Sequence, residues 1–325
     1  MRIESSKGRA PSRIVIAISI GLVIVIWSVN FIAAKIGLRS LPTLTMASFR
    51  VVLAGVVMIP AYLLCSRLNT FAESAETRRR GFNLRDLWIF FYLGFFGVAV
   101  NQFCFTAALR LTSVSHASVI VGMAPIYTLT LAVLLRLESA TLRKATGMAI
   151  SFAGIAVMAS EHGLTAHSPS LLGDAITLAG SVGFAIYVVW GKRVAGKYDA
   201  LTMTAFSHFA GALIVLPLAI RQALALGPAA NWLAVHWSAW ASLLYMAIFS
   251  SAVAYILYYW LLRYLEASQL AAFSYLLPVL ATILGIVWLG ESGSWGQLLG
   301  GALALGGVYW IESGRAPSAA TSVVS

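Results

Sequence analysis

The second half of this chain repeats the first half, and each half holds five apolar segments long enough to cross a membrane. Thr45 recurs as Thr202, 157 residues later, and Pro125 recurs as Pro278 at a spacing of 153, after a connection four residues shorter. The second spacing also relates a glutamate and two glycines to like residues: Glu138, Gly147 and Gly154 to Glu291, Gly300 and Gly307. Because five is odd, the second copy enters the membrane from the opposite side, which predicts an inverted repeat.

The composition excludes a soluble globular protein, because 60% of the residues are hydrophobic and only 10% are charged; soluble domains have roughly 25% charged residues. Apolar stretches of about 20 residues, each able to cross the hydrocarbon core as a helix, recur along the chain. They predict an all-α integral membrane protein with ten transmembrane helices as two inverted five-helix repeats. The predicted spans are 13–36, 42–64, 87–109, 115–136, 145–160, 171–192, 200–220, 238–262, 268–290 and 294–312.

These spans divide the chain into two repeats with short polar flanks. The connection between the repeats lacks Lys and Arg, so we expect it outside the cell. The expected organisation is a cytoplasmic N-terminus at 1–13, a first five-helix repeat at 14–160, an external linker at 161–170, a second, inverted five-helix repeat at 171–312 and a disordered cytoplasmic tail at 313–325.

The net charge of +11 is explained by membrane topology rather than by a nucleic-acid partner. With the N-terminus in the cytoplasm, 17 of the 22 Lys and Arg residues fall on the cytoplasmic side and three fall on the opposite side. This bias predicts a multi-pass protein of the bacterial inner membrane with both termini in the cytoplasm. The expected partners are the lipid bilayer and a small-molecule substrate, with no nucleic acid.

The two cysteines, Cys65 and Cys104, lie within or at the end of spans, so they support neither a disulfide framework nor a metal site. The chain has no His-Glu-x-x-His zinc motif and no Walker motif for nucleotide binding. We therefore expect no cofactor, no metal, no catalytic residue and no enzymatic activity.

Few polar residues lie deep in the spans, and these are the candidate substrate ligands, because an unsatisfied polar group is costly in hydrocarbon. Asn30, one turn after Trp27, is expected to face a cavity. Asn101 and Gln102 are consecutive and point about 100° apart on a helix, so at most one of them is expected to face the centre. Interhelical hydrogen bonding is the alternative role for each amide.

Two titratable side chains have competing interpretations. Arg50 lies inside the second span, where a charge is costly; it either binds a substrate carboxylate or reaches the head groups or a neighbouring helix. His208 either titrates near neutral pH or is a hydrogen-bonded packing residue. Lys35 and Lys192, near span ends, are expected to be anchors rather than ligands.

Pro125 and Pro278 fall near the centres of the fourth and ninth spans. Each proline lacks the amide that would bond the carbonyl four residues earlier, at Val121 and Ser274, so both helices are expected to bend. The freed carbonyls either line a substrate cavity, as in other inverted-repeat carriers, or are satisfied by neighbouring helices.

The eighth span is rich in aromatic residues. Tyr255 and Tyr259 lie one turn apart, and with Tyr187, Trp190 and Tyr275 they could line a pocket for an apolar or aromatic solute. An interfacial belt with core packing is the other interpretation.

The fifth and tenth spans carry small residues at helical spacing, which allow close helix approach. We expect scaffold packing or a dimer contact there, and hence a monomer or a weak homodimer through these two helices. The residues are Gly147, Ser151, Gly154, Gly296, Gly300, Ala304 and Gly307.

Short motifs occur in a fixed order along the chain: Trp27-Ser28-x-Asn30-Phe31-x-x-x-Lys35, Leu41-Pro42, Ser48-Phe49-Arg50, Leu289-Gly290-Glu291 and Gln297-Leu298-Leu299-Gly300. With the ten-span duplication, they resemble the EamA-type branch of the drug/metabolite transporter superfamily over residues 14–312. The first repeat departs from the family pattern, because Arg136-Leu137-Glu138 replaces the usual Gly-Glu pair.

The resemblance implies a ten-helix carrier whose central cavity is lined by helices one to four and six to nine, with helices five and ten packed outside. Members export amino acids and other small metabolites, and some import solutes. The residues that match the family pattern are Trp27, Asn30, Lys35, Arg50 and Glu291.

We therefore expect a secondary transporter that exports an amino acid, with aromatic and apolar ones among the candidates, or a related compound. It would alternate access around a site at the membrane midplane. An integral-membrane enzyme and a channel are the alternatives. No Asp or Glu lies deep in any span, which predicts movement down the substrate's own gradient, or weak coupling through His208, rather than tight proton antiport.

Overall fold

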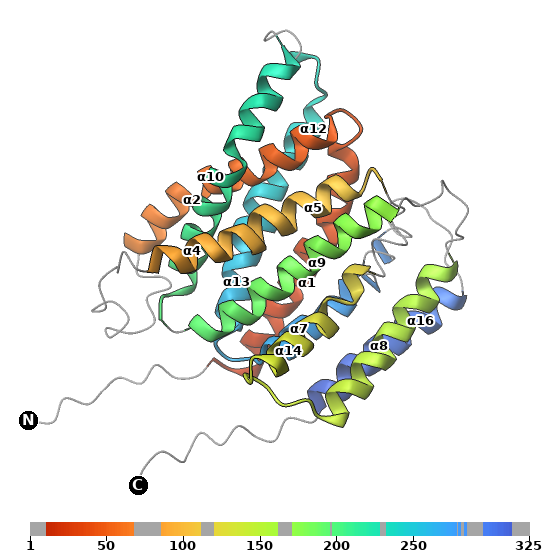
Figure 1. The fold of residues 1–325 in the computed structure, drawn as a ribbon. Helices are drawn as coiled ribbons and strands as arrows, with labels where there is room; N and C mark the ends of the chain where they lie inside the picture. Colours follow the sequence, from red (N-terminus) through yellow and green to blue (C-terminus); the bar gives the residue numbers. More distant parts are fainter. Residues whose placement is uncertain are drawn as a thin grey trace, which may run out of the picture.

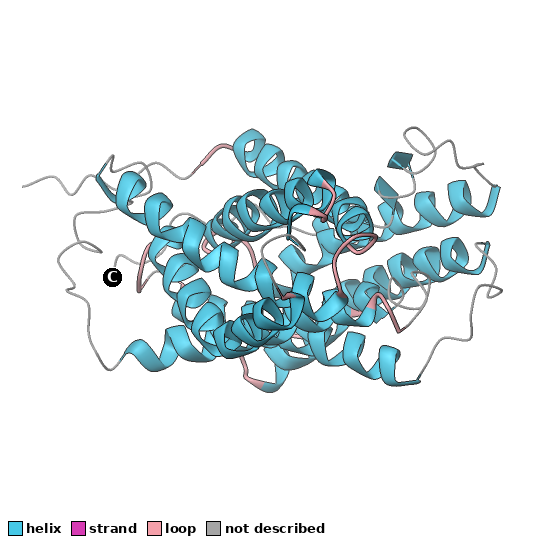
Figure 2. Ribbon diagram, turned by 90° about the horizontal axis from the view of Figure 1, so that it is seen from above, coloured by secondary structure: helices cyan, strands magenta, loops and turns pink. Residues whose placement is uncertain are grey.

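The chain forms a bundle of helices (Figure 1). The computed structural model describes residues 11–67, 86–111, 120–161, 171–195, 197–227, 232–277, 279–280, 283–284 and 295–313. Within those ranges no strand occurs, and the view from above in Figure 2 shows helices joined by short loops. The expected all-α class is confirmed.

Six helical segments of the described part are long and apolar enough to cross a membrane. Four are single helices, namely α1 (Arg13–Gly37), α2 (Thr43–Arg67), α9 (Leu171–Val194) and α10 (Ala200–Leu226). The other two each contain a π-helical section: α4 (Leu87–Leu93), η2 (Gly94–Val100) and α5 (Asn101–Ala108), and then α12 (Trp237–Tyr245), η3 (Met246–Val253) and α13 (Ala254–Leu261).

The described bundle also contains α7 (Ala124–Leu134), α8 (Leu142–Glu161), α14 (Ala267–Ala272), η4 (Phe273–Tyr275) and α16 (Trp295–Ser313), with a shorter helical piece at residues 120–122. The fourth span, expected at 115–136, is described only from 120 onward, and much of the ninth, expected at 268–290, lies outside the described residues. Pro278 and Glu291 are among the positions left out.

Polar side chains mark several helix starts. The Ser12 hydroxyl accepts a hydrogen bond from the Val15 amide at the start of α1, and Asp199 accepts one from the Thr202 amide at the start of α10. Each supplies an acceptor to an amide that has no partner within its helix. At the other end of α10, Gly227 adopts φ 77°, which glycine tolerates because it has no side chain.

The fourth span is interrupted, not merely bent. Residues 120–122 are helical, Met123 forms a turn, and α7 begins at Ala124. Pro125 therefore lies in the first turn of α7, where its missing amide would have had no helical partner. The expected bend is therefore a break at Met123, two residues before the proline.

The two π-helical sections occupy matching positions in the two halves. Gly97 in η2 and Ser250 in η3 are 153 residues apart, the spacing of the sequence repeat. A π-helical turn loosens the regular backbone ladder, and a carbonyl in each section accepts a hydrogen bond from an aromatic side chain. Tyr255 Oη donates to the Gly97 carbonyl, and Trp27 Nε1 donates to the Ser250 carbonyl, both at 3.1 Å.

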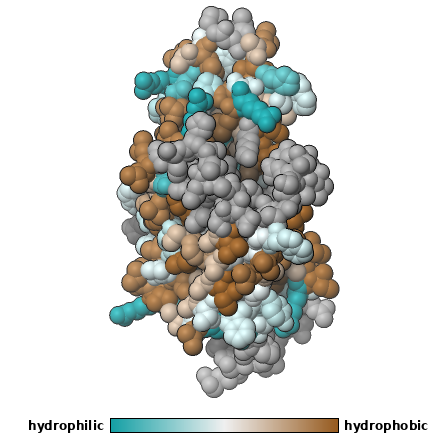
Figure 3. Space-filling model, turned by 90° about the vertical axis from the view of Figure 1, so that its right-hand side faces the viewer, coloured by the Kyte–Doolittle hydropathy of each residue, from teal (hydrophilic) through white to brown (hydrophobic). Residues whose placement is uncertain are grey.

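Helices α8 and α16 pack together at one side of the bundle (Figure 1). A Cβ atom on Gly154 would lie 2.4 Å from the Gly300 carbonyl, and one on Gly147 would lie 2.9 Å from the Gly307 carbonyl. These glycines therefore allow the two backbones to touch, which agrees with the expected packing role of the small residues. Much of the outer face is apolar (Figure 3), as lipid contact requires.

Candidate functional site

A cavity of about 100 Å³ lies between α1, α2, α5, α7, α9 and the η3–α13 segment. Its volume is several times the ~10–15 Å³ that one water needs. Eight residues singled out from the sequence line it: Trp27, Asn30, Arg50, Asn101, Gln102, Val121, Tyr255 and Ser274. Residues from 27 to 277 in the sequence therefore meet at one place.

The cavity lies deep in the bundle. On α1 and α5 its lining residues come from the C-terminal half of each membrane-length segment, and on α9 they run from Thr177 to Phe184, across the middle of the helix. The end where α1 begins is closed by a hydrophobic cluster that includes Ile20, Tyr187, Tyr258, Tyr259 and Leu261.

The lining includes residues that the sequence reasoning missed. They are Phe31, Phe105, Ala124, Thr177, Gly180, Ser181, Phe184, Ser250 and Leu277. Helical spacing offered a signal for two of them, since Phe31 follows Trp27 by four residues and Phe105 follows Asn101 by four. Ser250 offered none, because its place depends on the π-helical section.

Equivalent positions of the two repeats meet at the cavity. Four lining pairs obey the sequence spacings of 157 or 153: Trp27 and Phe184, Gln102 and Tyr255, Val121 and Ser274, Ala124 and Leu277. The repeat spacing, applied to Trp27 although the two residue types differ, would have found Phe184.

Arg50 is the charged residue of this lining, and it is 4% exposed. Its Nη1 lies 3.5 Å from Thr106 Oγ1 and its Nη2 lies 3.4 Å from Ser250 Oγ, both at the outer limit for a hydrogen bond. Its Nε has no partner. Among the described residues no carboxylate pairs with it, so the guanidinium is held in place but not neutralised.

Gln102 and His208 belong to one buried chain of hydrogen bonds. Ser251 Oγ donates to Gln102 Oε1 at 3.0 Å, and Gln102 Nε2 lies 3.3 Å from His208 Nε2. His208 Nδ1 lies 2.8 Å from the Thr204 carbonyl. Because Gln102 Nε2 can only donate and a carbonyl can only accept, the network fits a neutral histidine protonated at Nδ1. His208 does not line the cavity.

Asn101 also lines the cavity, so both neighbouring amides reach it, contrary to the expectation that at most one would. Asn101 Nδ2 donates to the Gly180 carbonyl at 3.0 Å, and its Oδ1 lies 3.1 Å from Tyr255 Oη. A cavity that wraps around α5 accommodates two side chains 100° apart.

Four other candidates lie outside the lining. Tyr187, Tyr259 and Tyr275 are completely buried, and Pro125 is buried in α7. Tyr187 packs between Tyr255 and Tyr259, with ring centroids 5.6 Å and 6.3 Å away. Of the expected aromatic pocket, only Tyr255 lines the cavity. Tyr187 and Tyr259 pack in the hydrophobic cluster at the end where α1 begins, and Tyr275 packs in a separate cluster with Leu129 and Met148. Pro278 lies outside the described residues.

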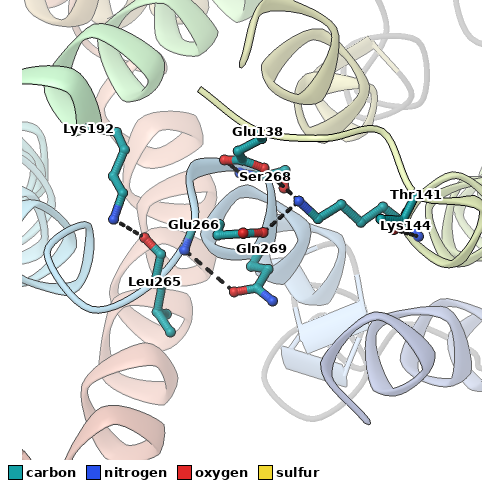
Figure 4. Close-up of polar contacts among 8 residues, drawn as sticks. All are labelled: Glu138, Thr141, Lys144, Lys192, Leu265, Glu266, Ser268 and Gln269. Atoms are coloured by element: carbon teal, nitrogen blue, oxygen red, sulfur yellow. Dashed lines mark hydrogen bonds and ion pairs between the residues drawn. The ribbon is translucent and has the colours of Figure 1, made fainter. Parts of the chain in front are cut away.

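A second polar cluster lies where α14 and α8 begin. We call it the terminal network; it consists of Glu138, Lys144, Glu266 and Ser268 (Figure 4). Lys144 Nζ lies 2.9 Å from Glu138 Oε2 and 2.5 Å from Glu266 Oε2. Glu138 also accepts hydrogen bonds from the Ser268 amide and hydroxyl. This network joins the first half of the chain to the second.

Lys192 lies beside this network but bonds to backbone. Its Nζ donates to the Leu262 and Leu265 carbonyls at 2.6 and 2.7 Å, just after the end of α13. A cation at that place satisfies carbonyls that have no helical partner and opposes the helix dipole. Lys192 is therefore an anchor, as expected, while the side chain of Lys35 lies outside the described part.

The fold and cavity define a class: a helical membrane protein with an internal, mainly apolar cavity that holds a few polar side chains, as in small-solute transporters. The model of the EamA-like transporter family matches residues 14–160 and again residues 171–313. The chain therefore belongs to the EamA-like transporter family, and the resemblance seen in its motifs is confirmed. It is a multi-pass membrane protein of a transporter family, and nothing in that family assignment indicates an enzyme.

Related proteins agree with this assignment. An "uncharacterized transporter" of Archaeoglobus fulgidus is 27% identical, over 92% of this chain and 99% of its own. A "probable terminal-alkyne amino-acid exporter" of Streptantibioticus cattleyicolor is also 27% identical, over 90% of this chain and 91% of its own. A solved structure titled "Crystal structure of protein" has a TM-score of 0.67 at 20% identity, over 92% and 96% of the two chains, which shows a shared fold.

Proposed function

We propose that this protein is a secondary transporter that exports an amino acid or a related small metabolite by alternating access around the cavity. The observation that carries the proposal is the buried cavity with an unneutralised Arg50 in its wall. A buried cation without an internal counter-ion suits an anionic group that arrives with the substrate. The amino-acid exporter among the relatives supports the same substrate class.

Contacts at one end of the bundle support alternating access. The hydrophobic cluster lies between the cavity and the end where α1 begins, and the terminal network links the two halves of the chain at that end. Transport then requires the terminal network to separate while the opposite end closes, as in carriers built from inverted repeats.

We extend this proposal to ten spans in two inverted five-helix repeats, with both termini in the cytoplasm of a bacterial inner membrane. Two contacts between α8 and α16 support the repeat, because Gly147 with Gly307 and Gly154 with Gly300 are exchanged when each residue is replaced by its repeat equivalent. Such reciprocal contacts are what a two-fold axis produces. On this topology the terminal network lies on the cytoplasmic side.

Reporter fusions test the topology. A reporter after Ser325 and one inserted between residues 161 and 170 should report opposite sides of the membrane. The same side for both would contradict five spans in each repeat.

Flux through proteoliposomes tests the function. Vesicles loaded with unlabelled L-phenylalanine should accumulate labelled L-phenylalanine from outside, because a carrier exchanges one substrate for another. Uptake that does not respond to internal substrate would indicate a channel, and absence of flux for L-phenylalanine, L-leucine, L-glutamate and L-lysine would overturn amino-acid transport.

The same assay tests energy coupling. We propose movement down the substrate's own gradient, because the cavity wall in the described residues has no carboxylate and His208 is hydrogen-bonded away from it. An imposed pH gradient should change the flux less than about twofold. A steep dependence on that gradient would indicate proton coupling.

A further inference from the structure

The π-helical section η2 leaves one backbone carbonyl without a helical partner. At the end of η2 the Asn101 amide bonds to the carbonyls of Phe96 and Val98. It passes over Gly97, which lies between them. The Gln102 amide, four residues after Val98, then begins the ordinary α-helical pattern of α5. The Gly97 carbonyl therefore accepts from neither of the amides that an α-helix or a π-helix would offer it.

The section η3 repeats this arrangement in the second half of the chain. The Ala254 amide bonds to the Phe249 carbonyl five residues earlier, and α13 then returns to the α-helical pattern, so the Ser250 carbonyl is passed over. Gly97 and Ser250 are 153 residues apart, the spacing of the sequence repeat. A buried carbonyl without a donor is costly, and more so in a membrane, so each of the two needs a partner from outside its own backbone.

An aromatic side chain of the opposite repeat supplies each missing donor. Tyr255 Oη, in the second repeat, lies 3.1 Å from the Gly97 carbonyl in the first. Trp27 Nε1, in the first repeat, lies 3.1 Å from the Ser250 carbonyl in the second. Both side chains line the cavity, and their rings pack edge to face with centroids 5.8 Å apart. We call these two hydrogen bonds the aromatic latches; each connects one repeat to the π-helical section of the other.

Each section has a second way to pair its carbonyl. If η2 adopts the α-helical pattern, the Gly97 carbonyl accepts from the Asn101 amide and needs no side chain. Every residue after the section then turns by about 100° and advances by about 1.5 Å, so that it takes the place of the residue that follows it. The latched π-helical register and the unlatched α-helical register are therefore two discrete arrangements of one segment.

We propose that η2 and η3 are the hinges of alternating access, and that Trp27 and Tyr255 are positioning residues that hold these hinges in the π-helical register. The inference rests on the proposed transport function and adds which segments change conformation. Opening a latch leaves the carbonyl unpaired in the π-helical register and so favours the α-helical one. Because both latches lie in the cavity wall, the register of each hinge and the shape of the cavity change together.

The native thiol of Cys104 reports the register of α5. Cys104 is half-buried, does not line the cavity, and packs against α9, where a Cβ atom on Gly180 would lie 3.1 Å from its own Cβ. In the α-helical register Cys104 takes the place of Phe105, which lines the cavity. A small water-soluble thiol reagent therefore distinguishes the two registers.

Tyr255→Phe opens one latch and keeps the ring. In a Cys65→Ser background this variant should label at Cys104 about tenfold faster than the parent, since losing a hydrogen bond of ~1.4 kcal/mol shifts a two-state equilibrium by that factor. Tyr259→Phe is the matched control, because it removes a buried hydroxyl that donates to the Gly191 carbonyl, outside both hinges. The control should leave the labelling rate unchanged.

Trp27→Phe tests the other latch. In the α-helical register of α13, Ala254 takes the place of Tyr255 in the cavity wall, whereas here it is completely buried. Ala254→Cys, in a chain whose two native cysteines are replaced by serine, should therefore label faster when Trp27→Phe is added. Trp310→Phe removes an indole N–H that donates to Thr146 and should have no effect.

Flux separates this inference from the proposed function. Exchange of L-phenylalanine through proteoliposomes should slow several-fold in Tyr255→Phe, because one of the two registers is then favoured, and should be normal in Tyr259→Phe. Unchanged labelling in both latch variants, or faster labelling with a normal exchange rate, would overturn the hinges and leave transport standing. Absence of flux in the wild type, with faster labelling in both variants, would overturn the transport function and leave the change of register standing.

Discussion

The cavity and the terminal network each place a basic side chain inside the protein, yet they differ in how its charge is balanced. Lys144 lies within 2.9 Å of two carboxylates, whereas the polar partners of Arg50 among the described residues are two hydroxyls at 3.4 and 3.5 Å. A buried cation with internal partners stabilises a particular arrangement of helices. A buried cation without them leaves part of its interaction for a ligand. The comparison therefore separates a structural charge, at Lys144, from the charge that we propose binds substrate, at Arg50.

The largest expected effect is at Glu138, whose side chain is 4% exposed. Glu138→Gln leaves Lys144 with one partner and should destabilise the protein by roughly 3 kcal/mol, the lower range for breaking a buried ion pair. Glu266→Gln is the matched control, because Glu266 is 49% exposed, and we expect less than about 1 kcal/mol for an exposed partner. Thermal unfolding in one detergent measures both. Equal effects would show that the network is not a buried charge pair.

Next in size is the contact between α8 and α16, which lies away from both charged sites. Gly154→Ala forces a methyl group against the Gly300 backbone and should destabilise the protein by ~1–3 kcal/mol. Gly306→Ala is the control, since no atom lies within 4 Å of its added methyl group, and it should stabilise α16 slightly. Substrate preference in the flux assay should be unchanged for both. A change in preference with Gly154→Ala would give this helix pair a part in the site.

Arg50 itself should show the opposite stability pattern from Glu138. Arg50→Met removes an unneutralised buried charge, so the substrate-free protein should be as stable as the wild type or more stable, by up to about 2 kcal/mol. The same variant should lose the increase in melting temperature that L-phenylalanine gives the wild type. A melting temperature several degrees below the wild type without substrate would place Arg50 among the structural charges.

The smallest effect concerns Asp86, just before α4, at the same end as the terminal network. Lys197 Nζ and Tyr198 Oη donate hydrogen bonds to its carboxylate at 2.7 and 2.6 Å, and these bonds hold the pKa of Asp86 below its ordinary value of 3.8. Because folding lowers this pKa, the ionised Asp86 carboxylate stabilises the folded protein fully above pH 3.8. That stabilisation is lost as the pH falls through the folded-state pKa. The stability difference between wild type and Asp86→Asn should be constant from pH 7 to about 5 and should shrink below pH 4. A difference that vanishes already at pH 6 would contradict this pairing.

Helical periodicity and polarity predicted part of the cavity lining, but not which aromatic residues reach the cavity. Asn30 and Arg50 were identified because polar residues inside apolar spans are costly, and Trp27 because it belongs to the family motif around Asn30. All three line the cavity. Tyr259 and Tyr275 followed the same aromatic pattern, yet they pack in the core. A tyrosine facing a cavity and one facing the next helix have the same sequence signature, because only the neighbouring helix decides which it meets.

The sequence by itself determined the membrane-length helices, the repeat register and the family, because hydrophobic length, residue spacing and short motifs are local properties of the chain. Only the tertiary structure decided which polar atoms remain unpaired. Whether Gln102 finds His208, or whether Arg50 finds no carboxylate among the described residues, depends on segments 106 and 200 positions away along the chain meeting in space. Hydrogen bonding is directional and short-ranged, so its outcome is fixed only when the helices have packed.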